Sequence, residues 1–374
     1  MERIRRLTPN PSAARTTSSG QGAPAIAAFA RRYGFQSALI LALAWIATAH
    51  TQSLVAGLIS GVILGMGALG LTLTYGVLKF PNLAHGLSMM LAAYLTFFFY
   101  TGQVQRSATS AGDVVVPLHF GALPGATDPI AGLSFGYGLI PAIIASAVVL
   151  TLVFLATDRL VFSRIRRRGR DSVLLLTIVS FGLAYVVISV IDLVWSPNLR
   201  HITLGAFPAT KYPFGIQLKD DQLFVFAAAI VCTGATFFVI YRTKMGRAMR
   251  AMSDNVSLAR ASGIPVGRVV VVTWIIVGAV TGISGSLLGV QAGLYPQLGL
   301  QLLLPLFAAA AVGGIGNPLG ALVGGLIVGI AQELAVNYVN AGYKIGVAFM
   351  ILVIVLLFRP NGLFGSAGFL QTQE

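Results

Sequence analysis

Long apolar runs alternate with short polar or basic stretches over most of this 374-residue sequence. A helix needs roughly 20 predominantly apolar residues to cross the hydrocarbon core of a bilayer, and ten runs approach that length. They lie near 35–50, 54–78, 84–101, 134–157, 172–195, 222–241, 269–292, 301–314, 318–336 and 343–358. The pattern predicts an all-α polytopic membrane protein with about ten transmembrane segments, some of them broken helices.

Two breaks interrupt apolar runs, at YGVLKFPNLAHG (75–86) and at GGIGNPLGA (313–321). Backbone freed at membrane depth persists only where it is buried in protein or lines a wet cavity, and transporters use discontinuous helices at their substrate sites. We therefore expect a substrate pathway near Tyr75, Asn82, His85 and Asn317. The alternative is that these residues only cap broken helices. The second break leaves open whether 301–336 crosses the membrane once, as a kinked span, or twice.

Composition supports the membrane assignment. The chain is 56% hydrophobic and 10% charged, with a mean hydropathy of +0.84, whereas soluble domains carry about 25% charged residues. Its net charge of +14 comes from short loops and the first residues, which fits membrane orientation and anionic lipid better than nucleic acid. The single cysteine, Cys232, excludes an intrachain disulfide.

Basic loops predict the orientation, because short segments rich in Lys and Arg stay in the cytoplasm. We expect residues 1–34 to be a basic cytoplasmic N-terminal tail, with an organellar transit peptide as the alternative reading. A single membrane domain spans 35–360, and a short tail (361–374) follows it. Loops 159–171 and 242–268 are then cytoplasmic, whereas 102–133 and 196–221 are external.

The loop 242–268 contains residues that are typical of the start and the end of a short helix. Ser253 or Asp254 can serve as N-cap, and Gly263 can end the helix in the left-handed conformation before Pro265. A capped helix at the membrane surface suits docking to another protein, and the alternative is a solvated connector that only fixes topology. The predicted docking residues are Asp254, Val256, Ala259, Arg260 and Gly263.

Glycines recur at helical spacing inside the apolar runs. Gly57, Gly61 and Gly65 form a GxxxGxxxG ladder, and Gly278 and Gly282 repeat the spacing. Small residues on one face let helices approach closely in lipid. We expect Gly57, Gly61, Gly65 and Gly282 to pack helices, either within this chain or against a related partner.

Several kinds of site are missing from the sequence. The four histidines have no ligand-like spacing for a metal, and no GxxxxGK[ST] phosphate loop is present. The apolar runs contain no charged relay of the kind a proton-driven carrier needs, with Asp192 and Glu333 the only candidates. We expect neither a metal, a bound cofactor nor an ATPase site on this chain.

Four ordered blocks carry a family resemblance. GALGLTLTYGVLKFPNLAHGLSMMLAAYL (67–95) is similar to the first signature of ATP-binding-cassette permeases for branched-chain amino acids, of the LivH type. The later signatures follow in order: GRAMRAMSDNVSLARASGI (246–264), TGISGSLLG (281–289) and LLLPLFAAAAVGGIGNPLGALVGGLIVG (302–329). The chain departs from the family in its long basic tail and its external insert around 102–131.

The resemblance implies a permease subunit in a bacterial cytoplasmic (inner) membrane, with 254–263 as the coupling helix that docks on an ATPase. It implies these partners: a second permease subunit or second copy, two ATPases that hold ATP and Mg²⁺, and an extracytoplasmic binding protein. Close relatives import urea, short amides or other amino acids, so these remain alternative substrates. A self-sufficient channel or secondary carrier is the alternative from another class, but it would need the coupling cluster that the sequence lacks.

Overall fold

The computed structural model describes residues 50–107, 110–130, 132–167, 172–202, 209–212 and 216–364. Contacts divide the chain at residue 51, and the unit from Gln52 onward is the one described below. The predicted tail 1–34, almost all of the predicted span 35–50 and residues 365–374 lie outside the described residues.

Each of the other nine predicted segments is a helix within the described part of the chain. The long helices are α2 (Thr51–Leu78), α3 (His85–Thr101), α4 (Leu139–Thr157), α6 (Val173–Trp195), α7 (Asp220–Arg242), α10 (Val266–Gln291), α11 (Leu298–Gly313), α12 (Pro318–Ala335) and α13 (Lys344–Phe358). Among the described residues, seven helical stretches are long and apolar enough to cross a membrane. The prediction of an all-α polytopic membrane protein is therefore confirmed.

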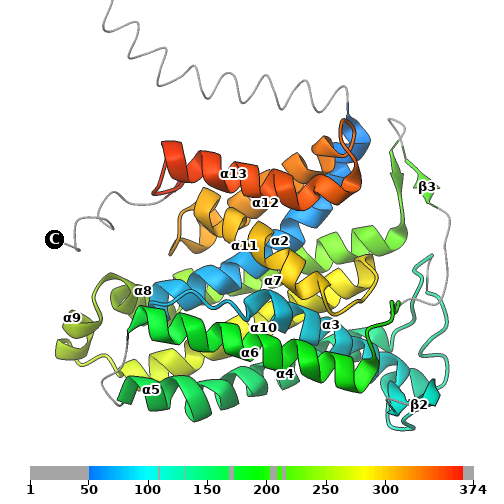
Figure 1. Ribbon diagram of the computed structural model, residues 1–374, viewed down its shortest axis with the longest axis horizontal. Coiled ribbons are helices and arrows are strands. Elements are labelled where there is room, and N and C mark those ends of the chain that lie inside the picture. The colour runs from blue at the N-terminus through cyan, green and yellow to red at the C-terminus, as the bar shows by residue number, and fades with distance from the viewer. Residues whose placement is uncertain are drawn as a thin grey trace, which may run out of the picture. The chain divides into compact units, whose positions relative to one another are not determined.

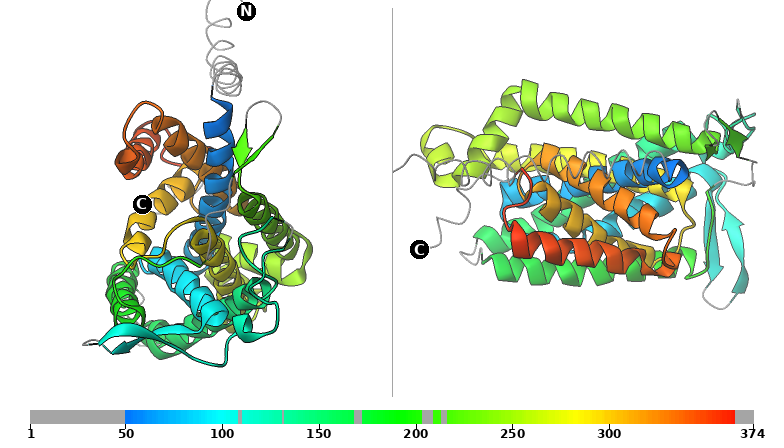
Figure 2. Two further views of the ribbon diagram at one scale, coloured as in Figure 1. Left: turned by 90° about the vertical axis from the view of Figure 1, so that its right-hand side faces the viewer. Right: turned by 90° about the horizontal axis from the view of Figure 1, so that it is seen from above.

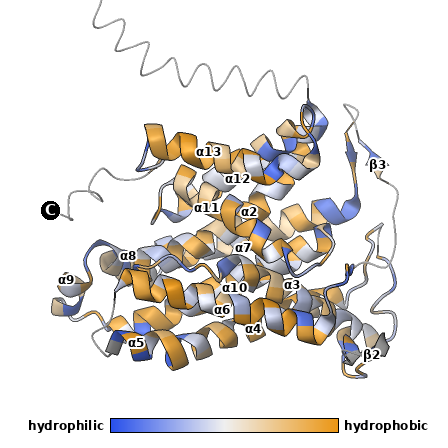
Figure 3. Cartoon of the chain, in the orientation of Figure 1, coloured by the Kyte–Doolittle hydropathy of each residue, from blue (hydrophilic) through white to orange (hydrophobic). Residues whose placement is uncertain are grey.

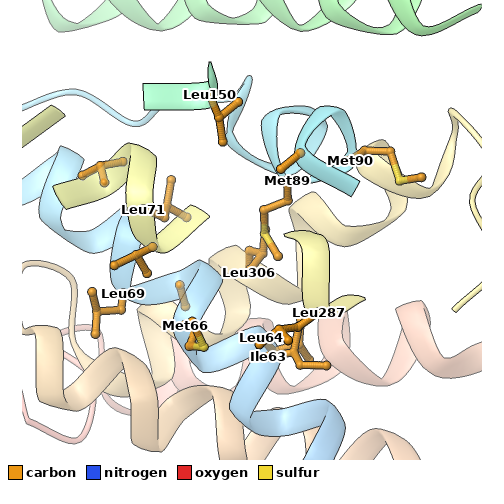
Figure 4. Packing of buried hydrophobic residues seen from close by; sticks show 14 of the residues in the cluster. Ile63, Leu64, Met66, Leu69, Leu71, Met89, Met90, Leu150, Leu287 and Leu306 are labelled. Atoms are coloured by element: carbon orange, nitrogen blue, oxygen red, sulfur yellow. The ribbon is translucent and has the colours of Figure 1, made fainter. Parts of the chain in front are cut away.

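Helices α10, α3 and α4 make the central contacts (Figure 1). Helix α10 packs on α3, α4 and α7, while α3 also packs on α6 and α11. The core between these helices and α2 is filled by apolar side chains, including Met66, Met89 and Leu287 (Figure 4). Apolar residues also cover the outward sides of α4, α6 and α13 (Figure 3), as expected for surfaces that meet lipid or another subunit.

Short elements gather at the two ends of the long helices (Figure 2). One end carries the antiparallel pairs β1 (Gln103–Ser107) with β2 (Ser110–Val115) and β3 (Thr210–Lys211) with β4 (Gln217–Leu218), together with the 3₁₀ turns η1 (Phe120–Ala122) and η4 (Ala341–Tyr343). The other end carries the π-helical turn η2 (Asp158–Phe162) and helices α5 (Ser163–Arg167), α8 (Lys244–Asp254) and α9 (Val256–Ala261). The two loops that we expect in the cytoplasm thus share one end.

Arg200 connects several segments at the end of the helix bundle that carries the β-strands. Its guanidinium donates two hydrogen bonds to Asp113, at 2.7 and 2.8 Å, and one to the Trp195 carbonyl at 2.8 Å. Its backbone also pairs with Leu294. The external insert, predicted as a loop, contains the β1–β2 hairpin, and Arg200 ties that hairpin to the α6 and α10 ends. The side of the membrane on which this end lies stays a prediction.

The break at 314–317 separates two helices, so 301–336 does not form one kinked span. Helices α11 and α12 pack against each other in opposite directions, and Gly314 follows α11 with φ +101°. The crossing is close because a Cβ on Gly313 would lie 2.0 Å from the Gly320 carbonyl oxygen. Of the two readings left open by the sequence, the structure has the pair of short helices.

Candidate functional site

The segment 79–84, called the re-entrant segment here, runs back along α2 after that helix ends at Leu78. Lys79 has φ +62°, and Pro81 disfavours helical backbone at Phe80, so the chain turns instead of continuing. Helix α3 then starts at His85, whose Nε2 is 2.8 Å from the Gly67 carbonyl oxygen. Gly67 lies eleven residues before the end of α2, which corresponds to about 16 Å of helix. The re-entrant segment therefore ends opposite the middle of α2.

Asn82 holds the start of α3. Its side-chain Oδ1 accepts from the Ala84 amide at 3.1 Å, and its backbone carbonyl accepts from the His85 amide at 3.2 Å. The preceding turn is held from another helix, because the Leu83 amide donates to Ser180 Oγ of α6 at 3.0 Å. Asn82 thus stabilises the turn that leads into α3, whose N-cap residue is Ala84.

Asn82 also lines a cavity of about 260 Å³ between α3, α4 and α6. The polar lining residues are Asn82, Ser88 and Thr157, and the other walls are apolar. One wall is an aromatic cluster in which Phe162 stacks on Trp274, with ring centroids 5.9 Å apart and planes 6° apart. Phe80 of the re-entrant segment packs on Phe162 at 4.9 Å. Trp274 could not be recognised from the sequence as a lining residue, because it lies on α10, far along the chain.

The four predicted pathway residues do not meet at one place. His85 is fully buried in the core beside Gly70 of α2 and Thr281 of α10, away from the cavity. Tyr75 lies in the last turns of α2, where its carbonyl accepts from the Lys79 amide. Of these four residues, Asn82 alone lines the cavity.

Asn317 lies at the second break and caps α12. Its Oδ1 accepts from the amides of Leu319 and Gly320 at 3.1 and 3.2 Å, and its Nδ2 donates to the Phe364 carbonyl at 3.0 Å. The neighbouring Gly316 lies close to Gly76 in the last turn of α2. Asn317 is therefore at the end of the bundle that carries α8 and α9, whereas Asn82 lies on the path toward its middle.

The predicted docking helix exists, with different bounds and a different cap. Helix α9 covers Val256–Ala261, and its N-cap is Asn255, whose Oδ1 accepts from the Leu258 amide at 2.9 Å. Ser253 and Asp254 cannot cap it because they are the last residues of α8. The sequence prediction chose the wrong residue because Ser, Asp and Asn are nearly equivalent caps.

Gly263 ends α9, as the sequence predicts from the preference for glycine just after the last turn of a helix. It has φ +78°, its amide donates to the Arg260 carbonyl, and the next amide, of Ile264, donates back to the Ala259 carbonyl at 3.0 Å. These two bonds form a Schellman motif, which fixes the end of the helix without a side chain. The short helix is therefore capped at both ends.

The exposed side of α9 differs from the predicted docking set. Ala259 is only 3% exposed and Val256 is half-buried, so both face the body of the protein. Leu258 is 66% exposed, between exposed Ser257 and Arg260. Leu258 is the residue that sequence reasoning missed; the available signal was a large apolar residue in a polar and basic loop that we expect in the cytoplasm.

Lys79 and Asp254 place opposite charges at the end of the bundle that carries α8 and α9. The Lys79 ammonium donates to the carbonyl of Ser253, next to Asp254. Burial lowers the pKa of Lys79 below its ordinary value, and the Asp254 carboxylate opposes that shift. Across the described residues, no group of three or more His, Cys, Asp or Glu side chains could hold a metal ion.

Glu333, one of the two acids singled out in the sequence, is paired. Its carboxylate accepts from Lys344 of α13 at 2.6 Å and from Ser60 of α2 at 3.2 Å. These residues join three helices, and Glu333 is 18% exposed. The arrangement satisfies the charge locally, which is what a low-dielectric setting requires.

The predicted packing glycines lie at helix crossings within this chain. A Cβ on Gly57, Gly61 or Gly65 would lie 2.6–2.9 Å from atoms of α12. The contact is reciprocal, because a Cβ on Gly325 or Gly329 would lie 2.3–2.4 Å from the backbone of Gly65 or Gly61. Gly282 of α10 meets Ala147 of α4 in the same way, at 2.5 Å.

Comparisons with known proteins agree on one family. Residues 53–356 match the family described as "Branched-chain amino acid transport system / permease component". The chain is 28% identical over 324 residues to the high-affinity branched-chain amino acid transport system permease protein BraD of Pseudomonas aeruginosa, covering 84% of this chain and 96% of BraD. It is 26% identical over 322 residues to the corresponding LivH of Escherichia coli, covering 84% and 95%. A shorter match, 23% identical over 157 residues, covers 40% of this chain and 36% of LivM from the same bacterium.

Proposed function

The chain belongs to the family of branched-chain amino acid transport permease components, and on this basis we propose that it carries such amino acids through the membrane as one subunit of an ATP-driven importer. It is a multi-pass membrane protein of this permease family, and ATP hydrolysis is assigned to partner subunits. The observation that carries the proposal is the family match, which spans both helix breaks and the α8–α9 segment (residues 244–264).

We assign docking of the ATPase to the exposed side of α9. A two-turn helix that is capped at both ends holds Leu258 out from the surface at a fixed position. An apolar side chain on the exposed face of a helix can lie in a hydrophobic groove of a partner. Exposed Arg260 adds a charge at the edge of the same contact.

We assign the substrate passage to the side of the bundle that holds the cavity at Asn82. A cavity of about 260 Å³ has room for a single small solute, and its walls are apolar except for three polar residues. Ligand sites of this type use apolar walls for fit and few polar groups for orientation. Leucine, isoleucine and valine match such walls, and recognition of their charged groups falls to an extracytoplasmic binding protein.

We also propose a second permease subunit as partner. LivH and LivM of Escherichia coli both resemble this chain, and each is named as a permease protein of a high-affinity branched-chain amino acid transport system. The apolar, weakly buried sides of α6 and α13 offer surfaces for such an association.

Reconstitution tests the function directly. The chain, its partner permease, the ATPases and the binding protein are placed in proteoliposomes, and uptake is measured for labelled branched-chain amino acids, other amino acids, urea and short amides. We expect ATP-dependent uptake of leucine, isoleucine and valine. Uptake of urea or amides alone would refute the substrate class, and uptake by this chain without ATPases would refute the importer.

A variant separates docking from passage. Leu258→Asp should abolish binding of the ATPase subunits while the permease stays folded, because Leu258 makes its contact outside the body of the protein. Leu199→Asp, at a similarly exposed leucine (61%) in the loop after α6 at the opposite end of the bundle, serves as the matched control and should keep ATPase binding. Normal ATPase binding by Leu258→Asp would contradict the assignment of α9.

A further inference from the structure

Lys79 occupies a conformation that lysine rarely adopts. Its φ of +62° makes it one of two non-glycine residues with positive φ in the described part of the chain, the other being Ser196. The left-handed region is unfavourable for an ordinary L-residue because its Cβ crowds the backbone. Such strain persists only where surrounding contacts hold it, and it concentrates at functional sites.

The contact that holds Lys79 comes from the α8–α9 segment. Its ammonium donates to the carbonyl of Ser253, in the last turn of α8. The final carbonyls of a helix have no partner within the helix and carry partial negative charge, so a cation there is stabilising. Asn255, the cap of α9, is only two residues further along. The ammonium therefore contacts the backbone directly before α9.

A second contact supports the first. A Cβ on Gly76 would lie 3.3 Å from Ser253 Oγ and 3.6 Å from Gly316 Cα. The last turn of α2 thus touches both the end of α8 and the α11–α12 break. Three segments distant in sequence meet at this point.

Movement at Lys79 would reach the cavity through a short stretch of chain. Phe80 is fully buried against Phe162, and Asn82 lines the cavity three residues beyond Lys79. Asn82 also holds the first amides of α3. Because Phe80 is fully buried and the next residues are hydrogen-bonded to α6 and to the start of α3, a displacement of Lys79 would shift the start of α3.

We propose that Lys79 is a positioning residue that links the α8–α9 segment to the re-entrant segment, so that a shift of α9 moves Asn82 and the start of α3. The link rests on the proposed function, in which an ATPase docks on α9. Its role is to pass the movement of the ATPase subunits to the cavity, without contacting either ATP or the substrate.

The test uses the complete transport complex and two readouts. Amide hydrogen exchange is followed at residues 80–88 and at 256–264, with and without a non-hydrolysable ATP analogue, and ATP hydrolysis is measured with and without loaded binding protein. Lys79→Asn and Lys79→Gly both tolerate positive φ and remove the ammonium. Lys79→Arg keeps a cation, and Arg159→Gln removes an exposed cation elsewhere at the same end.

In the wild-type complex we expect ATPase subunits to protect 256–264 and the nucleotide analogue to change exchange at 80–88. In Lys79→Asn and Lys79→Gly, protection of 256–264 should persist and the response at 80–88 should disappear. Stimulated hydrolysis should fall by about tenfold, a typical size for coupling between two sites, while basal hydrolysis is unchanged. Lys79→Arg should restore most of the response, and Arg159→Gln should match the wild type.

A wild-type response at 80–88 in Lys79→Asn and Lys79→Gly would overturn the link and leave the proposed function intact. Failure of both variants to assemble would also overturn it, because a residue that only transmits movement is not needed for assembly. Absence of protection at 256–264 in the wild-type complex would instead refute docking on α9.

Discussion

The crossing of α2 and α12 allows a quantitative prediction from one methyl group. In Gly329→Ala, the new Cβ would lie 2.4 Å from Gly61 Cα and 2.5 Å from Gly61 N. Carbon atoms in favourable contact are about 3.5–4.0 Å apart, so the helices must separate by roughly 1 Å. The obstacle is backbone on both sides, and no side chain can rotate away.

Gly234→Ala in α7 is the matched control. Nothing described in the structure lies within 4 Å of a Cβ at that position. Both substitutions replace a helical glycine by alanine, so both gain the same helix propensity of up to about 1 kcal/mol. Their difference therefore isolates the contact. Overpacking of a close interface costs about 1–3 kcal/mol, which is the difference we expect in the free energy of unfolding.

The measurement is an SDS titration of each purified variant in mixed micelles, followed by near-ultraviolet circular dichroism. We expect Gly329→Ala to unfold at a lower SDS fraction than the wild type and Gly234→Ala at an equal or higher one. Equal midpoints for the two variants would refute the reasoning, because α12 would then not depend on close approach to α2.

Three further outcomes are expected. Asn82→Ala should lower uptake by about tenfold without changing the affinity of the binding protein, as expected for a residue that acts only in passage; wild-type uptake would exclude Asn82 from the passage. Arg200 holds the pKa of Asp113 below its usual range, so the ion pair stabilises the fold above about pH 4, the unfolded pKa, and this contribution is lost as pH falls through the folded pKa. Asp113→Asn should therefore be less stable than the wild type at neutral pH but equally stable in acid. The loss in free energy of unfolding should be less than about 1 kcal/mol, because the carboxylate is 36% exposed. A loss of stability that persists in acid would contradict the ion pair as its cause. In a Cys232→Ala background, an impermeant thiol reagent applied to intact cells should label a cysteine at Leu118 and spare one at Asp254; labelling at Asp254 would reverse the predicted orientation.

The long helices were predictable from sequence because their signal is local. The break at Asn317, for example, is marked by Gly and Pro, which act on the adjacent backbone. The packing glycines could likewise be recognised, although only the structure shows that Gly61 meets Gly329 in the same chain.

The candidate site was less predictable because its contacts are not local. Asn82 was found from its place in a break, but Trp274 reaches the same cavity from another helix. His85 looked similar to Asn82 in sequence, yet its ring points into the closed core. Ala259 and Leu258 are neighbours, and only the packing of α9 decides which one faces outward.

The re-entrant segment has a consequence for how the chain is made. The Leu83 amide finds its partner, Ser180, only 97 residues later, and Phe80 packs on Phe162. When α2 and α3 leave the ribosome and enter the bilayer, this stretch therefore lacks the groups that later satisfy it. Unsatisfied backbone is costly in lipid, so we expect α2 and α3 to wait at the insertion machinery until α6 has been synthesised. Nascent chains that stop before Ser180 should then be cleared by membrane proteases, and those that extend past α6 should persist.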